Sequence, residues 1–302
     1  MLRGEDQART EIANARLQAI ASLPHLAVFS DEAHHTYGQA LDRELKKVRK
    51  TVDYLHEKSP NLIAVINTTG TPYSKRQLLR DVVVWYGLSQ GIRNGILKEV
   101  DGNIQSFSFD HTQTAQLLDH VIGDFFQDYG DVRLPNGAPA RLAIYFPQTD
   151  DLLTSRPVIE ARLAQLGLST SLILENHTKA PQADIDAFAR LNDPDAPQRV
   201  ILLVNKGTEG WNCPSLFACA LARKLKTSNN FVLQAASRCL RQIPGNTHKA
   251  RIYLSADNYG VPDRQLQGAY GETLSASNRS KHSSRRTTIP LRTLHLPPLA
   301  VR

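Results

Sequence analysis

Leu26-Ala-Val-Phe-Ser-Asp-Glu-Ala-His34 decides the fold: it is a short apolar run that ends in two adjacent carboxylates. A second apolar run, Asn61–Asn67, ends in Thr68-Thr-Gly-Thr-Pro72. Short apolar runs separated by helical spacing are typical of parallel strands covered on both faces. Ligands of an open parallel sheet bind beyond the carboxyl ends of its strands. We therefore expect Asp31 and Glu32 to lie at a ligand site.

The rest of the chain continues this alternation and predicts an α/β fold. A polar stretch, Glu99–Gln113, is the candidate boundary between two domains, and Val82–Tyr86 before it is a candidate third strand. The predicted helices span about 38–57, 112–128, 152–166, 182–191 and 229–240, and the predicted strands after the boundary are Arg141–Phe146, Ser169–Leu174, Val200–Val204, Phe217–Ala222 and Ala250–Leu254.

Composition is that of an ordinary globular protein, with 41% hydrophobic and 22% charged residues among 302. No run of about 18 apolar residues predicts a membrane span, and no signal peptide is evident, so we expect a cytoplasmic protein without a membrane partner. The three cysteines lack metal-ligand spacing and are expected to be free thiols.

The net charge of +7 is concentrated near the end of the sequence. Residues 271–302 contain six Lys and Arg against one Glu, a net of +5. Such a segment suits a polyanion such as DNA, and it suits a solvated end without fixed structure equally well.

The carboxylates after the first run can support nucleotide chemistry. One carboxylate at this place can hold Mg²⁺ on a nucleotide and its neighbour can orient the attacking water, whereas the alternative is a solvated acidic loop. A metalloprotease is excluded, because His34 and His35 are adjacent and diverge on a helix. Thr69-Gly-Thr71 could relay between two sites or form a plain turn.

Two further segments carry candidate chemistry in the second half. Lys206-Gly-Thr-Glu-Gly-Trp-Asn212 has two glycines that allow close approach to a phosphate, and its alternative interpretation is a strand-to-helix turn. Gln234, Arg238 and Arg241 are spaced to share one face of a helix, where guanidinium groups could stabilise a transferring phosphoryl group. Their alternative is a basic solvated face.

These motifs, in this order, resemble those of superfamily 2 DNA helicases and translocases, above all the Res (helicase) subunit of type III restriction enzymes. The resemblance runs from about residue 20 to about residue 272. Its specific strings are SDEAHHTYG, TTGTPY, DVVVWYGLSQGIRNGI, LLVNKGTEGWNCPSLFACALARK and FVLQAASRCLRQIPGN.

The resemblance implies an ATP site shared by two domains and served by Mg²⁺. By it, Asp31 and Glu32 are the metal-linked and catalytic carboxylates, and Gln234, Arg238 and Arg241 are catalytic, with Arg241 as the arginine finger. The implied ATP-binding residues are His34, Glu209, Gly210 and Asn212, and the residues implied to bind DNA or to couple it to ATP are Thr69, Gly70, Thr71 and Thr208. Asn212 and Ser237 depart from the family, in which many members carry Asp and Gly there.

The implied organisation is two RecA-like parallel-sheet domains and a tail. Residues 1–105 would be the C-terminal part of the first domain, 106–272 the second, and 273–302 a basic tail of low order. No Gly-Lys-Ser or Gly-Lys-Thr occurs in the sequence, so we expect the first domain to be incomplete, lacking the P-loop. Its sheet would then have two or three strands and an exposed apolar edge.

The predicted function is the ATP-dependent DNA translocase or helicase region of a Res-like subunit, truncated or split, with little activity alone. The implied partners are DNA, a separate chain carrying the P-loop, and a modification (methyltransferase) subunit. The alternative is a non-catalytic DNA-binding or assembly module derived from such a helicase.

Overall fold

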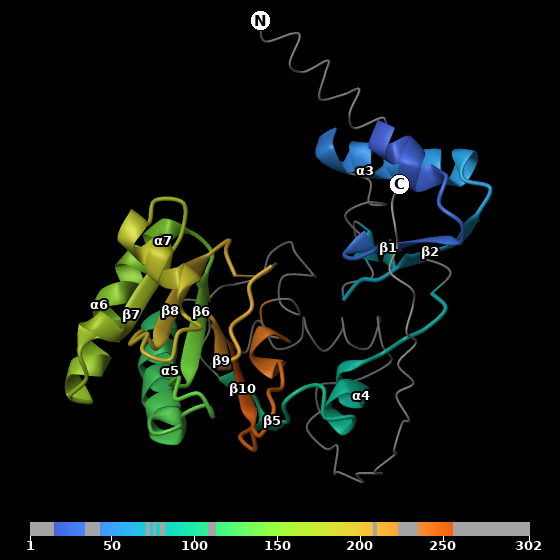
Figure 1. Cartoon of the computed structure of the whole chain (residues 1–302). Coiled ribbons are helices and arrows are strands. Elements are labelled where there is room, and N and C mark those ends of the chain that lie inside the picture. Colours follow the sequence, from blue (N-terminus) through green and yellow to red (C-terminus); the bar gives the residue numbers. More distant parts are fainter. Residues whose placement is uncertain are drawn as a thin grey trace, which may run out of the picture.

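The structure, a computed structural model, describes residues 15–33, 43–70, 73–74, 77–78, 82–107, 113–207, 210–222, 235 and 237–255. Its strands form a two-stranded parallel sheet, a six-stranded sheet and a small antiparallel pair, β3 (Tyr73–Ser74) with β4 (Gln77–Leu78). Figure 1 shows the two larger sheets in separate parts of the molecule. The predicted α/β class with parallel sheets is confirmed.

The two-stranded sheet is built from the stretches that opened the sequence analysis. β1 (Leu26–Ser30) pairs in parallel with β2 (Leu62–Asn67), in a register that places Ser30 beside Asn67. The chain between them includes α3 (Arg43–Lys58), where a helix was predicted, and residues 15–21 before β1 are also helical. The register brings the carboxyl ends of both strands to the same edge.

Large apolar side chains of this small sheet are exposed. Phe29 of β1 is 73% exposed and Ile63 of β2 is 65% exposed. The expectation that both faces of every strand are covered is therefore wrong for this sheet. Among the residues that the structure describes, this sheet has two strands, as expected, and the missing P-loop strand that would explain its size stays a prediction.

Val82–Tyr86 is not a strand, and the candidate third strand is wrong. The backbone of this segment has no strand pairing, and Val83 is 94% exposed. Val84 is also 77% exposed, so two of its β-branched side chains lack the packing that favours a strand. The short helix expected after it is present as α4 (Leu88–Arg93).

The six-stranded sheet is parallel throughout, in the order β5-β10-β9-β6-β8-β7. Its strands are β5 (Val100–Phe107), β6 (Arg141–Phe146), β7 (Ile173–Asn176), β8 (Val200–Val204), β9 (Leu216–Leu221) and β10 (Ala250–Ser255). The helices between them are α5 (Thr114–Tyr129), α6 (Thr149–Gln165) and α7 (Gln182–Ala189), with 3-10 turns η2 (Thr170–Leu172) and η3 (Ser237–Leu240).

Both faces of this sheet are covered, as the buried apolar runs predicted. Side chains of α5 and α6 pack with alternate strand residues such as Leu142 and Leu202. On the other face, α4, α7 and η3 pack with residues such as Tyr145 and Leu203, through Ile92 of α4 among others. Figure 1 shows α5 and α7 on opposite sides of the strands.

The polar stretch expected as a boundary contains an edge strand. β5 pairs in parallel with β10, so a division after residue 105 would pass through a strand of the larger sheet. The domain division stays a prediction, and the tail expected at 273–302 lies outside the described residues. None of the described helices is long and apolar enough to cross a bilayer.

Candidate functional site

Asp31 is held at the carboxyl edge of the small sheet by the end of the neighbouring strand. The Thr68 hydroxyl donates to Asp31 Oδ1 at 3.0 Å, and the Glu32 N–H donates to the same oxygen at 2.9 Å. Two backbone bonds fasten the strand ends, from Thr68 N to Ser30 O (2.9 Å) and from Ala33 N to Thr68 O (3.0 Å). The carboxylate is thus exposed but fixed in position.

The backbone turns sharply directly after this aspartate. Glu32 has φ +48°, a left-handed conformation that is uncommon for a residue with a side chain. Such conformations cluster at functional sites, where surrounding bonds enforce them. Here the enforcing bonds are those of Asp31 and Thr68.

The structure describes only some of the residues near the small sheet that were expected to bind ATP or to couple it to DNA. Thr69 is half-buried and Gly70 is exposed, with open space where a Cβ would lie. His34 and Thr71 lie outside the described residues. Thr68, which sequence reasoning passed over, is the threonine whose hydroxyl contacts Asp31.

A second left-handed turn follows β8 in the larger sheet. Asn205 has φ +52° and Gly207 has φ +69°. A Cβ on Gly207 would lie 2.9 Å from both Leu203 and Trp211, so only glycine fits there. Tyr145 of β6 donates its hydroxyl hydrogen to the Gly207 carbonyl at 3.1 Å.

Tyr145 keeps its proton, because burial raises the pKa of its hydroxyl well above the ordinary value. It therefore remains a hydrogen-bond donor throughout the physiological range. Local sequence could not reveal this contact, because Tyr145 has the pattern of an ordinary core residue of a strand.

The loop continues through Gly210 and Asn212 on its way to β9. Gly210 has φ +67° with open space around it. Trp211 stacks on Phe188 of α7 with ring centroids 5.1 Å apart, and Asn192 donates to the Asn212 carbonyl at 2.9 Å. Thr208 and Glu209 lie outside the described residues.

Both predicted arginines are fastened to this loop. Arg238 donates from Nη1 to the Trp211 carbonyl at 3.1 Å, and Arg241 donates from Nη1 to Asn212 Oδ1. The structure thus brings together four of the predicted site residues: Arg238 and Arg241 bond to the loop that carries Gly210 and Asn212.

The prediction that Arg238 and Arg241 share a helix face is wrong. Arg238 lies in the short turn η3, which ends at Leu240, and Arg241 forms an isolated antiparallel bridge with Leu97. The 3-10 turn ends because the backbone of residues 240–242 pairs with residues 96–98 instead of continuing a helix. Gln234 lies outside the described residues.

The predicted site therefore consists of two halves, each held by its own contacts. Asp31 and Glu32 belong to the small sheet, and the Gly210–Asn212 loop with its arginines belongs to the large one. Their convergence on one ligand stays a prediction.

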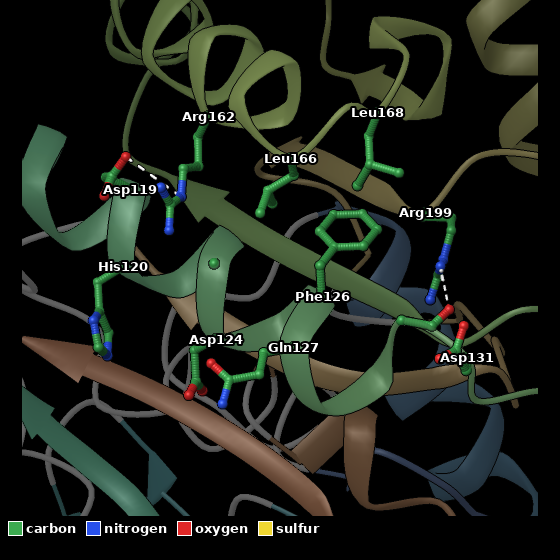
Figure 2. A pocket seen from close by; sticks show the side chains of 12 residues that line it. Asp119, His120, Asp124, Phe126, Gln127, Asp131, Arg162, Leu166, Leu168 and Arg199 are labelled. Carbon is green, nitrogen blue, oxygen red and sulfur yellow. Dashed lines mark hydrogen bonds and ion pairs between the residues drawn. The ribbon is translucent and has the colours of Figure 1, made fainter.

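A cleft of about 500 Å³ lies elsewhere, between α5, α6 and the start of β8 (Figure 2). It includes none of the predicted site residues. Arg199 in its wall donates to the carbonyls of Tyr129, Gly130 and Ala140, and Arg162 lies 3.6 Å from Asp119. Because these cations already have partners, the cleft is a poor site for a phosphate.

Comparison with solved structures identifies the fold. The chain is similar to a fragment described as the HsdR subunit of a type I restriction enzyme from Vibrio vulnificus, with TM-score 0.51 and 14% identity over 73% of this chain and 44% of that one. The fold is RecA-like. The predicted RecA-like α/β class is thereby confirmed, and 14% identity supports the fold alone.

Two other similar structures have TM-scores below 0.5. One is the ATP-dependent type ISP restriction-modification enzyme LlaBIII bound to DNA (TM-score 0.44, 18% identity, 77% of this chain and 18% of that one). The other is the helicase MrfA bound to DNA (0.48, 10%, 82% and 32%). The chain spans less than half of each of these three structures. No family model matches the chain, nor does any curated protein sequence.

Proposed function

We propose that this chain is the ATP-dependent DNA translocase or helicase region of a restriction enzyme, of the Res type found in type III enzymes. The observation that carries the proposal is the pair of preformed half-sites. One presents a carboxylate fixed at the carboxyl ends of two parallel strands, and the other presents two arginines fixed beside a glycine-containing loop.

The first half-site suits a magnesium ion bound to a nucleotide. Within the described part of the chain, both hydrogen bonds accepted by Asp31 end on Oδ1, which leaves Oδ2 for a cation. No cluster of three His, Cys, Asp or Glu side chains occurs among the described residues. Mg²⁺ commonly takes one or two carboxylates and completes its shell with phosphates and water, so this donor set fits Mg²⁺-ATP.

The carboxylates have separate roles in this proposal. Asp31 and Glu32 would hold the metal side of the nucleotide, and Glu32 would orient a water molecule for attack on the γ-phosphate. Bound Mg²⁺ supplies charge neutralisation on the phosphate oxygens.

The second half-site would supply positive charge to the transferring phosphoryl group. Arg241 would act as the arginine finger, with Arg238 beside it, and Asn212 would hold Arg241 until the nucleotide arrives. Gln234, Glu209 and His34 would complete the nucleotide site. Gly210 would allow the backbone to approach a phosphate, because a left-handed glycine leaves the space above it open.

A P-loop must come from outside these 302 residues, because no Gly-Lys-Ser or Gly-Lys-Thr occurs within them. We propose that another polypeptide segment supplies it, and that the exposed Phe29 and Ile63 of the small sheet mark where it packs. DNA would lie along both lobes, contacted by Thr69, Gly70, Thr71 and Thr208. A modification subunit would supply recognition of a DNA sequence.

The second candidate is a non-catalytic DNA-binding or assembly module. The net charge of +5 over residues 271–302 favours it, because that segment can neutralise phosphates without any nucleotide. Under this alternative the chain binds DNA with a strong salt dependence and hydrolyses no ATP in any combination.

The decisive experiment measures Mg²⁺-dependent, DNA-stimulated ATP hydrolysis by the purified chain, alone and with a polypeptide that supplies a P-loop strand and helix. We expect little turnover alone and DNA-stimulated turnover with the added segment. Arg241→Ala should then lower kcat by about 10³-fold or more, the usual effect of an arginine finger, while DNA affinity is unchanged.

Arg190→Ala is the matched control, because Arg190 is an exposed arginine at the end of α7, outside the site. If Arg190→Ala and Arg241→Ala reduce turnover equally, Arg241 is not the finger. Clear turnover by the chain alone would contradict the need for an added P-loop. DNA binding without turnover in every combination would favour the non-catalytic module.

A further inference from the structure

Lys98 is a fully buried lysine that the site described so far does not use. It follows α4 and precedes β5, and its exposed fraction is 0%. Its ammonium group donates to three backbone carbonyls, those of Leu216 (2.8 Å), Cys239 (3.2 Å) and Pro214 (3.3 Å). The Phe217 ring lies below it, with the centroid 4.0 Å from Nζ.

The backbone around Lys98 runs beside the segment that carries the arginines. Lys98 N donates to the Leu240 carbonyl at 2.6 Å, and Gln242 N donates to the Ile96 carbonyl at 3.3 Å. Leu97 and Arg241 are partners in an antiparallel bridge. The segment 96–98 therefore forms a short ladder with residues 240–242.

The carbonyls that Lys98 binds belong to the two segments that meet at the second half-site. Cys239 lies between Arg238 and Arg241, and Pro214 follows the loop that carries Asn212. Lys98 thus ties the arginine segment and the loop to one point. The hydrogen bonds of Arg238 to Trp211 and of Arg241 to Asn212 span the same two segments on the exposed side.

We propose that Lys98 is a positioning residue that sets the geometry of Arg238 and Arg241 by clamping their segment to the Gly210–Pro214 loop. The proposal rests on the proposed function for its catalytic consequence only. The clamp itself is a property of the chain and can be tested without nucleotide.

The hydrogen-bond acceptors at this position match the three donors of an ammonium group. Three carbonyl oxygens converge on Nζ, and a protonated lysine has three N–H donors to match them. Methionine would fill the volume but would leave the carbonyls without this donor, and buried unpaired polar groups are costly. Arginine would keep the charge with a different donor geometry.

The hydrogen bonds that Lys98 makes should depend on pH, because the number of its N–H donors changes when its ammonium group loses a proton. Burial lowers the pKa of its ammonium group to about 8, against the opposing influence of the Cys239, Cys213 and Cys219 thiols. Arg141 of β6 is the charged group on the far side of the same loop, where it donates to the Ser215 hydroxyl. Above pH 8 the neutral amine has only two donors for three acceptors, so the clamp loosens.

Trp211 can report this loosening, because its carbonyl accepts from Arg238 and its ring stacks on Phe188. The chain has two tryptophans, so Trp85→Phe leaves Trp211 as the only one. In this background we measure acrylamide quenching of Trp211 fluorescence from pH 7 to pH 9.5. The variants are Lys98→Met, Lys98→Arg and, as the control, Lys249→Met, which removes an exposed lysine near the same ladder.

With Lys98 present, quenching should increase with a midpoint near pH 8, and Lys249→Met should leave this transition unchanged. Lys98→Met and Lys98→Arg should abolish the transition, because neither side chain titrates there. A transition that persists in either variant would overturn the proposal. If Lys98→Met does not fold, as circular dichroism would reveal, the comparison of Lys98 with Lys98→Arg decides.

The second test measures kcat for ATP hydrolysis by the chain supplemented with a P-loop segment. Lys98→Met should lower kcat about 100-fold, the scale of a displacement of about 1 Å, with a smaller change in KM for ATP. Lys98→Arg should recover part of kcat. An unchanged kcat in Lys98→Met would refute the catalytic consequence, whereas absence of turnover in the unsubstituted chain would refute the proposed function and leave the fluorescence test of the clamp intact.

Discussion

Replacing Lys98 with methionine should change how the stability of the chain depends on pH. Lys98 is fully buried, and its pKa is lowered by burial from its ordinary value of 10.5 to about 8. The unfolded chain therefore holds this proton more tightly than the folded chain does. In the window between pH 8 and pH 10.5 the unfolded state binds more protons, so the stability conferred by this position rises with pH.

The magnitude follows from the width of that window. At about 1.36 kcal/mol per pKa unit, the difference between 10.5 and about 8 corresponds to about 3 kcal/mol in full. About 2 kcal/mol of this should be gained between pH 7 and pH 9.5, because the folded state loses its proton near pH 8 while the unfolded state retains it until pH 10.5.

Urea denaturation at pH 7.0, 8.0, 9.0 and 9.5 measures this effect as a difference in unfolding free energy between the unsubstituted chain and Lys98→Met. Taking the difference removes the contribution of the other lysines and tyrosines. Lys249→Met should track the unsubstituted chain at every pH. A difference between the unsubstituted chain and Lys98→Met that stays flat across this range would refute the buried, weakly basic lysine on which the clamp depends.

Three further substitutions test other contacts. Thr68→Val should lower the unfolding free energy by about 1 kcal/mol, since it removes a hydrogen bond to the Asp31 carboxylate, and Thr68→Ser should retain it. Phe29→Lys should change stability by less than about 0.5 kcal/mol, because Phe29 is 73% exposed, but should reduce self-association in sedimentation equilibrium. Gly207→Ala should lower the unfolding free energy, measured by urea denaturation, by about 1–3 kcal/mol more than Gly137→Ala does. Both glycines have positive φ, but only a Cβ at position 207 would collide with other side chains.

The strands were predictable where a buried apolar run is bounded by turn residues. Arg141–Phe146 and Val200–Val204 were predicted with the bounds that the structure has, because each is fully buried on both faces. Val82–Tyr86 is also an apolar run and forms no strand, because strand formation depends on a partner that local sequence does not reveal.

The strand β5 was missed for the converse reason. Its sequence, Val-Asp-Gly-Asn-Ile-Gln-Ser-Phe, is polar and contains glycine and asparagine, which are depleted in strands. Among the described strands it pairs with β10 alone, at the edge of the sheet. An edge position tolerates such residues, and only the tertiary pairing identifies it.

The residues of the candidate site could be predicted, whereas the hydrogen bonds and strand pairings that hold them in place could not. The place of Asp31 after an apolar run and the helical spacing of Arg238 and Arg241 indicated these residues, and the family resemblance implied their roles. Helical spacing could not reveal that Arg241 leaves the turn to pair with Leu97, because that pairing joins residues distant in sequence. The contact of Thr68 with Asp31 depends on strand register in the same way.

The outermost pair of the larger sheet has a consequence for engineering. β5 and β10 are the first and last strands of that sheet in the chain, and they lie side by side in the same direction. The chain therefore enters this strand pair at the start of β5 and leaves it at the opposite end, where β10 ends. Six residues of β10 at about 3.3 Å each set these points about 20 Å apart. A circular permutant with new termini in the Pro135–Gly137 turn would need a tether from Ser255 that reaches the chain before α4, because Ile92 and Lys98 are buried in the same unit. Its refolding would show that these strands need no particular order of synthesis.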